Sequence, residues 1–495
     1  MPTIAAALRW RARRHPDLPA TWFEGRTRTF AQLDASSSAL AGGLTGRLGL
    51  QPGDRIAVLD NNSDAYLELV FAADRAGLVT VPVSWRLTAR EVAEVVGDAD
   101  PAVLVAGEGF GEAARGAGCR TLGFDELPRG GGDPFRDGAD AVTWQLYTSG
   151  TTGLPKGAML TNANLMGLMA PLGFECPELQ EGTRSLVAMP LYHIGGCGWA
   201  LASIVRGACA VVAREVVPPD LLRLMADQRV TTGFLVPAVL LFLTQLPDAR
   251  SPDLSALRSL VYGASPISPD LLRRSLDVFG CRFTQLYGLT ETTGAIAALQ
   301  HEHHEGARLL SCGRPMFGAS LRVVDPAGEE LPPGETGEIV YRGPGLMRGY
   351  WRRERDTADT IRDGWLHTGD MGSVDGEGFF FVKDRVKDMV VSGGENVYPA
   401  EVEAVLADHP DVADVAVIGV PDPTWGESVK AVVVRTQGSE LSAGELVEWS
   451  RSRLAGFKRP RSVDFTEALP RNPTGKVLKR ELRDPYWAGQ VRQIG

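Results

Sequence analysis

The chain has 495 residues, of which 44% are hydrophobic and 23% are charged, so it can bury large cores and is too apolar to be disordered as a whole. Its 51 Lys and Arg against 61 Asp and Glu give a net charge of −10, which disfavours non-specific binding to nucleic acid. At roughly 150 residues per domain, the length suggests about three domains.

Apolar runs alternate with amphipathic segments from Arg55 to Tyr287. We predict buried strands at 55–59, 79–83, 102–106, 142–147, 186–189, 208–213, 257–262 and 282–287. We predict helices at 65–76, 89–96, 219–228 and 269–279. This alternation is typical of βα units in which helices cover both faces of parallel sheets. Because the strands are too many for one sheet, we expect two doubly wound subdomains.

Two apolar stretches could resemble targeting or membrane segments. Residues 4–8 are too few for a signal-peptide core. Residues 195–213 are interrupted by Arg206, which would be costly at a bilayer centre, so we predict a buried helix followed by a strand. The cysteines form no CxxC pair, which indicates buried thiols in a reducing compartment. We therefore expect a soluble cytoplasmic protein. The cysteines are Cys119, Cys176, Cys197, Cys209, Cys281 and Cys312.

The pattern changes near Gly313 and again at Asp384. Turn clusters at 325–328 and 332–334 separate short strands, as in a small antiparallel barrel. The last part contains a predicted helix at 400–407, strands at 412–420 and 429–434, and a helix at 443–454. The predicted fold class is therefore α/β, with a large domain of residues 1–383 that holds two doubly wound subdomains and a small β-barrel. A smaller α+β domain spans residues 384–495.

Residues 147–157, Tyr-Thr-Ser-Gly-Thr-Thr-Gly-Leu-Pro-Lys-Gly, follow a predicted strand. Glycines let the backbone approach a ligand closely, and hydroxyls, amides and a lysine supply donors for phosphate oxygens. The segment is not a Walker loop, because its lysine precedes the last glycine. We predict a phosphate-binding loop. Its candidate binding residues are Thr148, Ser149, Gly150, Thr151, Thr152, Gly153 and Lys156.

This loop resembles the phosphate loop of the adenylate-forming superfamily, which includes acyl-CoA synthetases, aryl-CoA ligases, luciferases and peptide-synthetase adenylation domains. The resemblance extends over essentially the whole chain, in the order of the superfamily's motifs. The matching segments are 192–196, 263–266, 285–291, 337–338, 342–344, 365–370, 384–388, 392–396 and 470–476. The resemblance implies ATP, Mg²⁺ and CoA as cofactors.

The resemblance also implies a role for each site residue. Glu291 would hold Mg²⁺ on the triphosphate, and Thr290 would donate to the α-phosphate. Lys476 would be the catalytic lysine, a positive charge between the carboxylate and the α-phosphate. For the nucleoside, Tyr287 and Gly288 would contact adenine opposite Gly263, Ala264 and Ser265, while Asp370 and Arg385 would hold the ribose. His193 would contact the acid as a gate or a carboxylate partner rather than as a general base.

The superfamily uses its small C-terminal domain twice, and the same use is implied here. One orientation would bring Lys476 to the α-phosphate, and a rotation about Asp384 would bring the segment around Gly393 and Gly394 to the acyl-adenylate. Two glycines suit the wall of a narrow pantetheine tunnel, because a side chain would obstruct it.

Three further patterns give weaker indications of function. Residues 109–114 fit the GxGxxA pattern of dinucleotide-binding proteins but have no second supporting motif, which argues against an NAD oxidoreductase. The histidine-rich residues 301–305 lack HExxH spacing, so we expect a solvated loop there. The basic side chains Lys458, Arg459 and Arg461 could contact CoA phosphates or simply face solvent.

The first acidic residue after His193 is Glu215, so no carboxylate is placed to hold the ammonium of an amino acid. An apolar pocket suits a fatty or an aryl acid, and residues 394–403 with 470–476 look most like bacterial fatty-acyl-CoA synthetases. We predict an ATP-dependent acid–CoA ligase for medium- to long-chain fatty acids. The alternatives are an aryl-acid (cinnamate-like) CoA ligase and an adenylating enzyme with a non-CoA acceptor, such as a carrier protein or a diazotisation-type reaction. A catalytically inactive binding protein is disfavoured because Lys476, Glu291 and Asp370 are present.

The expected partners are a small carboxylic acid, ATP and CoA, with no nucleic acid. We expect no transmembrane segment, and a homodimer stays open.

Overall fold

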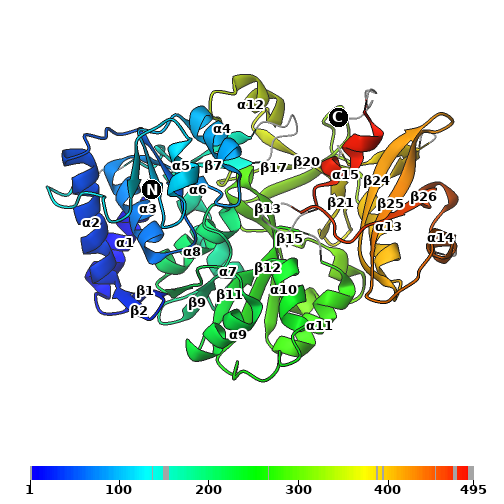
Figure 1. The fold of residues 1–495 in the computed structure, drawn as a ribbon, viewed down its shortest axis with the longest axis horizontal. Helices are drawn as coiled ribbons and strands as arrows, with labels where there is room; N and C mark the ends of the chain where they lie inside the picture. The colour runs from blue at the N-terminus through cyan, green and yellow to red at the C-terminus, as the bar shows by residue number, and fades with distance from the viewer. Residues whose placement is uncertain are drawn as a thin grey trace. The chain divides into compact units, whose positions relative to one another are not determined.

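The computed structural model describes residues 3–135, 138–148, 155–265, 267–385, 388–392, 395–451, 453–471 and 477–488, with only the backbone given for residues 384, 385 and 396. The chain forms two compact units (Figure 1). The first unit contains Met1–Leu321 and Tyr341–Leu366, and the second contains Arg322–Val340 and His367–Gly495.

The larger sheet of the first unit has the strand order β15-β14-β13-β12-β11-β9-β10-β1-β2. Its strands β13, β12, β11, β9, β10 and β1 are parallel, and β14, β15 and β2 are antiparallel to their neighbours. The bounds are β1 Pro19–Phe23, β2 Arg26–Thr29, β9 Arg184–Val187, β10 Cys209–Val212, β11 Thr232–Leu235, β12 Ser259–Gly263, β13 Arg282–Leu289, β14 Gly294–Leu299 and β15 Arg314–Pro315.

The other sheet of the first unit has the order β18-β8-β7-β4-β3-β5-β6. Strands β7, β4, β3, β5 and β6 are parallel, whereas β8 returns antiparallel to β7 and β18 pairs antiparallel with β8. The bounds are β3 Arg55–Leu59, β4 Val79–Val83, β5 Val103–Ala106, β6 Thr121–Gly123, β7 Val142–Thr148, β8 Lys156–Thr161 and β18 Gly349–Tyr350.

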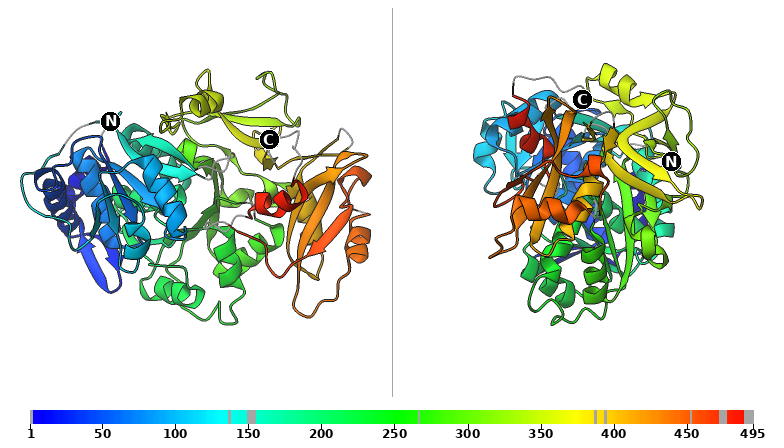
Figure 2. Two further views of the ribbon diagram at one scale, coloured as in Figure 1. Left: turned by 45° about the horizontal axis from the view of Figure 1, so that its top comes forward. Right: turned by 90° about the vertical axis from the view of Figure 1, so that its right-hand side faces the viewer.

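Helices lie against both sheets, as Figures 1 and 2 show. Their bounds are α1 Ile4–Arg14, α2 Phe30–Gly46, α3 Asp64–Ala76, α4 Ala89–Ala99, α5 Gly111–Arg115, α6 Asn162–Gly167, α7 Met169–Glu175, α8 Ile194–Arg206, α9 Pro218–Asp227, α10 Pro237–Thr244, α11 Pro269–Phe279 and α12 Glu354–Thr360, with 3-10 turns η1 Thr290–Thr292, η2 His301–His303 and η3 Gly306–Leu310. One continuous apolar core joins the two sheets through α1, α3 and α8. This arrangement confirms the prediction of a mixed α/β fold.

Local chemistry explains where several helices begin and end. Helix α11 starts at Ser268, whose hydroxyl accepts from the backbone N–H of Leu271, and Pro269 occupies the first turn, where its missing N–H costs nothing. It ends at Gly280, with φ 57°, in the left-handed region that favours glycine. Helix α4 begins with a capping box between Thr88 and Glu91.

An antiparallel sheet stands where the small β-barrel is expected. Its order is β16-β17-β20-β19, and β21 also pairs with β20. The bounds are β16 Ser320–Val324, β17 Gly337–Arg342, β19 Ile361–Arg362, β20 Trp365–Val374 and β21 Phe380–Arg385.

The rest of the second unit is an α+β element with a sheet of order β23-β22-β25-β24, to which β26 adds in parallel beside β25. One apolar cluster, from Val390 to Leu454, covers one face, and a smaller one around Ile418 covers the other. The bounds are β22 Val390–Ser392, β23 Glu395–Val397, α13 Pro399–Ala407, β24 Val412–Asp422, β25 Gly426–Arg435, α14 Ala443–Arg451, η4 Gly456–Lys458, β26 Ser462–Phe465, α15 Lys479–Arg483 and η5 Asp484–Tyr486.

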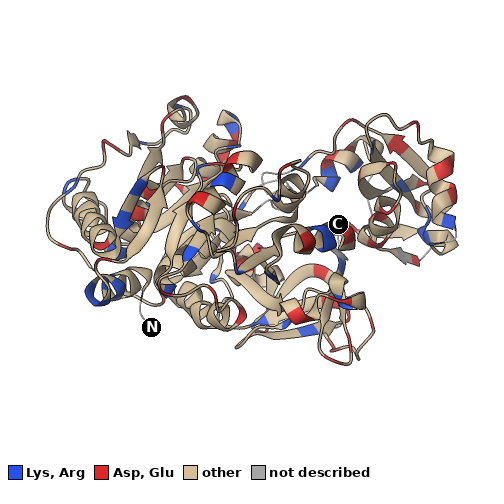
Figure 3. Ribbon diagram, turned by 90° about the horizontal axis from the view of Figure 1, so that it is seen from below, with Lys and Arg blue, Asp and Glu red and all other residues tan. Residues whose placement is uncertain are grey.

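Acidic and basic residues are interspersed over both units (Figure 3). All six cysteines are free thiols. Within the described part of the chain, none of the helices has the length and apolarity needed to span a bilayer. The predicted domain boundary at Asp384 falls in β21, inside the second compact unit, and it stays a prediction.

Candidate active site

Predicted site residues of the first unit gather at one edge of the larger sheet. The carboxyl ends of neighbouring parallel strands meet at the same edge. His193 comes after β9, Gly263 ends β12, and the segment from Tyr287 to Glu291 ends β13. The fold therefore brings together turns that are far apart in the sequence, in the manner of a ligand site on an open α/β sheet.

Two glycines at this edge are required by close backbone approach. A Cβ on Gly263 would lie 2.2 Å from the carbonyl oxygen of Leu286, and a Cβ on Gly288 would lie 1.9 Å from that of Gly294. Ala264 has φ 68°, a left-handed conformation that is unusual for a residue with a side chain. Strain of this kind clusters at functional sites. Ser265 is half-buried beside it.

The turn that carries Thr290 and Glu291 is tightly held. The hydroxyl of Thr292 accepts from the N–H of Leu289 at 2.8 Å and donates to the carbonyl of Gly294 at 2.6 Å. These bonds fix the 3-10 turn η1 directly after β13. Tyr287, Thr290 and Glu291 are all half-buried, so their side chains are ordered by the fold yet accessible to a ligand.

The predicted phosphate loop lies in the sequence between β7 and β8, which pair as antiparallel neighbours. Thr148 pairs with Lys156 across the hairpin, and its hydroxyl donates to the carbonyl of Lys156 at 3.5 Å. The loop residues Ser149, Gly150, Thr151, Thr152 and Gly153 lie outside the described residues. The structure therefore gives the two ends of the loop.

A side-chain network supports the strand that leads into this loop. The hydroxyl of Tyr147 donates to Oδ2 of Asp98 at 2.6 Å and accepts from Nε2 of Gln145 at 2.9 Å. Arg353 donates to the other oxygen of Asp98 at 2.9 Å. Burial and the Asp98 carboxylate raise the pKa of Tyr147, so it stays a neutral donor. This network attaches the end of β7 to Asp98 of α4 and, through it, to Arg353.

Lys156 and Glu291 both contact Tyr350. Lys156 forms an ion pair with Asp356 of α12, and its Nζ lies 5.4 Å from the centre of the Tyr350 ring. The Tyr350 hydroxyl donates to Oε1 of Glu291 at 2.8 Å. This aromatic side chain therefore places the base of the phosphate hairpin against the turn that carries Glu291.

His193 is the N-terminal flanking residue of α8, and its side chain makes no capping bond. Its Nε2 is buried and has no hydrogen-bond partner among the described residues. Burial, with a smaller contribution from Arg86, lowers the pKa of His193 to about 4. At neutral pH the ring is uncharged, so it can offer a hydrogen bond but no positive charge to a carboxylate.

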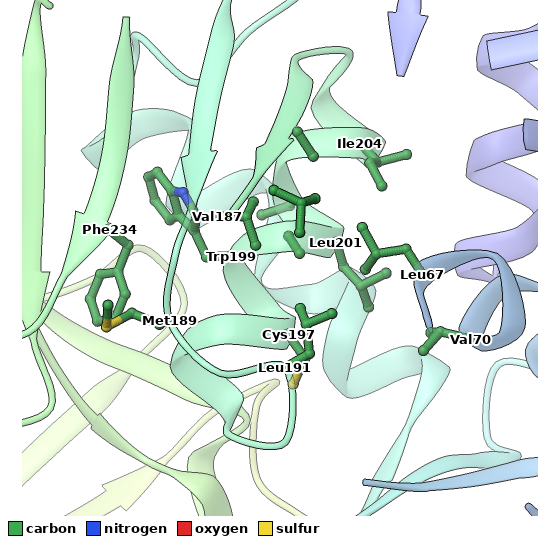
Figure 4. Close-up of a cluster of buried hydrophobic side chains, with 14 of the residues drawn as sticks. Leu67, Val70, Val187, Met189, Leu191, Cys197, Trp199, Leu201, Ile204 and Phe234 are labelled. Carbon is green, nitrogen blue, oxygen red and sulfur yellow. The ribbon is translucent and has the colours of Figure 1, made fainter. Parts of the chain in front are cut away.

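Apolar side chains line the region next to His193. A Cβ on Gly195 would lie 2.9 Å from Cε1 of Phe234, and the rings of Phe234 and Trp199 have centroids 6.1 Å apart. Figure 4 shows Met189 beside Phe234 on this wall. Phe234 and Trp199 are 6% and 5% exposed, so both rings belong to the buried apolar cluster beside His193.

The remaining predicted site residues belong to the second unit. Asp370 on β20 is 5% exposed and is the register partner of Arg385 on β21. Asp384 pairs with Met371 in the same ladder. Only the backbone of Asp384 and Arg385 is described, and Gly393, Gly394 and Lys476 lie outside the described residues. The ladder therefore places the backbone of Arg385 directly opposite that of Asp370.

The side chains near Glu291 fit Mg²⁺. This ion prefers oxygen ligands and usually takes one or two carboxylates together with substrate phosphates and water. Glu291 supplies a half-buried carboxylate whose Oε1 already accepts from Tyr350. The described residues contain no group of three or more His, Cys, Asp and Glu side chains that could hold a metal.

Other features of the structure lie away from this edge. A cavity of about 1030 Å³ opens at the amino ends of β3, β4 and β7. The histidine-rich loop is held against the larger sheet instead of being fully solvated. His304 forms a hydrogen bond with the Tyr262 hydroxyl at 3.1 Å, and His301 accepts from the N–H of Phe283 at 3.2 Å. Lys458 forms an ion pair with Glu401 at 2.6 Å.

Tyr350 and Asp356 are not predicted from the sequence. Their partners Glu291 and Lys156 are 59 and 200 residues away, and no local pattern reports such contacts. The one available signal was the aromatic pair of Tyr350 and Trp351 after Gly349, next to the matched segments.

Comparisons with known proteins identify the family of the chain. The family model described as AMP-binding enzyme matches residues 8–351, and the model described as AMP-binding enzyme C-terminal domain matches residues 401–476.

Three similar proteins cover nearly the whole chain. A feruloyl-CoA synthase from Amycolatopsis sp is 43% identical over 96% of this chain and 97% of its own length. The fatty acid–[acyl-carrier-protein] ligase ScoC of Streptomyces coeruleorubidus is 38% identical over 99% of this chain and 98% of its own. The structure of o-succinylbenzoate CoA synthetase (MenE) from Bacillus subtilis, in complex with the acyl-adenylate intermediate OSB-AMP, has a TM-score of 0.90 and 32% identity and covers 98% of both chains.

Proposed function

This chain belongs to the AMP-binding enzyme family, and from that membership we propose that it is an AMP-forming acid–CoA ligase acting in the cytoplasm. A carboxylate would attack the α-phosphate of ATP, giving acyl-AMP and pyrophosphate, and the thiol of CoA would then displace AMP to give the thioester. The observation that carries the proposal is the match of both family models over the chain, and the contact of Tyr350 with Lys156 and Glu291 supports it by joining the predicted phosphate hairpin to the strand turns of the larger sheet.

The residues divide the first half-reaction between them. Lys156 and the loop residues would bind the phosphates, Thr290 would donate to the α-phosphate, and Glu291 would hold Mg²⁺, which would offset the charge of the triphosphate. Tyr287 stacks on adenine, Asp370 accepts from the ribose, and Lys476 stabilises the charge that builds on the α-phosphate. Such chemistry requires positioned charge and donors more than a protein nucleophile.

The second half-reaction uses the C-terminal residues. Asp384 acts as the hinge, and the stretch at Gly393 and Gly394 admits pantetheine. The uncharged ring of His193 contacts the bound acid without removing a proton from it. A homodimer stays a prediction.

We propose an aryl acid of the hydroxycinnamate type as the substrate. The expected preference for fatty acids is not confirmed, since the acids named for the similar proteins differ. Two observations favour an aryl acid: the feruloyl-CoA synthase has the higher identity of the two relatives above, and the apolar cluster beside His193 contains the aromatic rings of Phe234 and Trp199. A fatty acid with a carrier-protein acceptor is the second candidate, supported by the similarity to ScoC.

Pyrophosphate release with a panel of hydroxycinnamic, benzoic and fatty acids, with and without CoA, tests the proposal, and Lys476→Ala serves as the inactive control. We expect release that depends on a hydroxycinnamic acid, with acyl-CoA formed when CoA is present. Preference for fatty acids, with acyl transfer to a carrier protein and none to CoA, would favour the second candidate. The absence of acid-dependent release with every acid would contradict adenylation itself.

A further inference from the structure

Tyr350 is fixed by backbone contacts on two sides. It pairs with Ala158 in the β18–β8 ladder, and the next residue, Trp351, donates its N–H to the carbonyl of Gly157 at 2.8 Å. Its own N–H donates to the hydroxyl of Thr357 at 2.9 Å. The side chain is 8% exposed, so the ring has little freedom to move.

The same segment holds Glu291 at two points. Met347 donates its N–H to the backbone carbonyl of Glu291 at 2.9 Å, and the Tyr350 hydroxyl donates to the carboxylate at 2.8 Å. A carboxylate can only accept a hydrogen bond and the tyrosine hydroxyl carries a proton, so the hydroxyl is the donor. Glu291, whose side chain would otherwise sample several rotamers, is thus held through one carboxylate oxygen, and the other has no hydrogen-bond partner among the described residues.

Resting on the proposed role of Glu291, we propose that Tyr350 is a positioning residue that orients the Glu291 carboxylate toward the metal ion of Mg²⁺·ATP. A second partner that orients a metal-binding carboxylate contributes to metal affinity without touching the metal. Because the ring of Tyr350 also lies near Lys156, the informative variant is Tyr350→Phe, which removes the hydroxyl and keeps the ring.

Tyr341→Phe is the matched control. The Tyr341 hydroxyl is also buried and also makes a hydrogen bond, accepting from the N–H of Gly345 at 3.0 Å. It lies close in the sequence to Tyr350, and within the described part of the chain no hydrogen bond joins its hydroxyl to Glu291. Both variants lose one buried hydroxyl, so a merely structural effect would be similar in the two.

The readout is the affinity of Mn²⁺ for the enzyme with a non-hydrolysable ATP analogue, measured by electron paramagnetic resonance. We expect Tyr350→Phe to weaken Mn²⁺ binding about tenfold and Tyr341→Phe to change it less than about twofold. The Mg²⁺ concentration for half-maximal pyrophosphate release should rise in parallel for Tyr350→Phe, while the KM for the acid stays within about twofold.

A double-mutant cycle with Glu291→Gln distinguishes the positioning role of Tyr350 from the metal-binding role of Glu291. We expect Glu291→Gln to weaken Mn²⁺ binding and Tyr350→Phe to add nothing in that background. Equal effects of the two tyrosine variants, or a full effect of Tyr350→Phe in the Glu291→Gln background, would overturn the positioning role and leave the metal role of Glu291 standing. Unchanged Mn²⁺ affinity in Glu291→Gln would overturn the metal role of Glu291, and the role of Tyr350 with it.

Discussion

Lys156 forms an ion pair with Asp356, a residue of α12 that lies 200 positions later in the sequence. The lysine that ends the phosphate loop therefore already has an anionic partner. A phosphate group would compete with this carboxylate for the same ammonium group.

Asp356→Asn should tighten ATP binding. Partly exposed ion pairs contribute at most about 1 kcal/mol, so we expect the KM for ATP to fall by about two- to fivefold with little change in kcat. Asp359→Asn on the same helix is the control, because its side chain is exposed and far less constrained. A KM for ATP that rises in Asp356→Asn would show that the pair positions Lys156 instead of competing for it.

Phe234→Leu should change the choice of acid. Replacing the ring that faces Gly195 with a smaller side chain opens the wall beside His193, and differences of this size in apolar pockets amount to about 1–3 kcal/mol. We expect the ratio of kcat/KM for a long acid over a benzoic acid to rise about tenfold. Phe279→Leu, which alters a buried ring on α11, should leave the ratio unchanged; a ratio that shifts equally in both variants would place the acid elsewhere.

His304 should make the protein sensitive to acid. Burial lowers the pKa of His304 to about 4, below the value of about 6.5 for an exposed histidine. Between these values the unfolded chain binds a proton on this ring and the folded chain does not, so stability is lost as the pH falls from about 6.5 to about 4.

Thermal unfolding of wild type and His304→Gln from pH 7 to pH 4.5 measures this effect. We expect the wild type to be the more stable at pH 7, because the variant loses the bond to Tyr262. The difference in the free energy of unfolding between wild type and variant should shrink by about 1–3 kcal/mol as the pH falls. An advantage that is constant over this range would mean that the ring titrates alike in both states.

Lys476→Ala and Gly394→Leu should affect opposite half-reactions. A charge that acts only while negative charge builds on the α-phosphate is worth about 3–4 kcal/mol, so Lys476→Ala should slow adenylation by about 10²–10³-fold and spare thioester formation from a supplied acyl-adenylate. Gly394→Leu should spare adenylation and block CoA. Rapid-quench measurement of each half-reaction tests both, and equal loss of the two half-reactions in either variant would contradict this division.

Much of the fold follows from local sequence. The predicted bounds of 55–59 and 79–83 coincide with β3 and β4, because a strand buried on both faces is a continuous apolar run between turns. Strand β2 is Arg-Thr-Arg-Thr with no buried residue and was not predicted, since its pairing at a sheet edge needs no apolar signal.

The candidate site also contains residues that the sequence predicts and residues that it does not. Gly263, Gly288 and the turn at Thr290 were predicted because their segments resemble motifs of the superfamily, and each motif is a short continuous stretch of sequence. Tyr350 and Asp356 were not, because their contacts depend on β18 pairing with β8 and on the position of α12, which tertiary packing decides.

Among the side chains that the structure describes, none that precedes Val390 belongs to the two apolar clusters of the C-terminal residues. A polypeptide that starts at residue 388 would therefore carry its own hydrophobic core, and residues 1–385 would keep theirs. The protein should tolerate division into two separately expressed pieces at this point. Adenylation by the large piece alone would be very slow and would recover on mixing, with the small piece acting as a diffusible subunit that supplies Lys476 in trans.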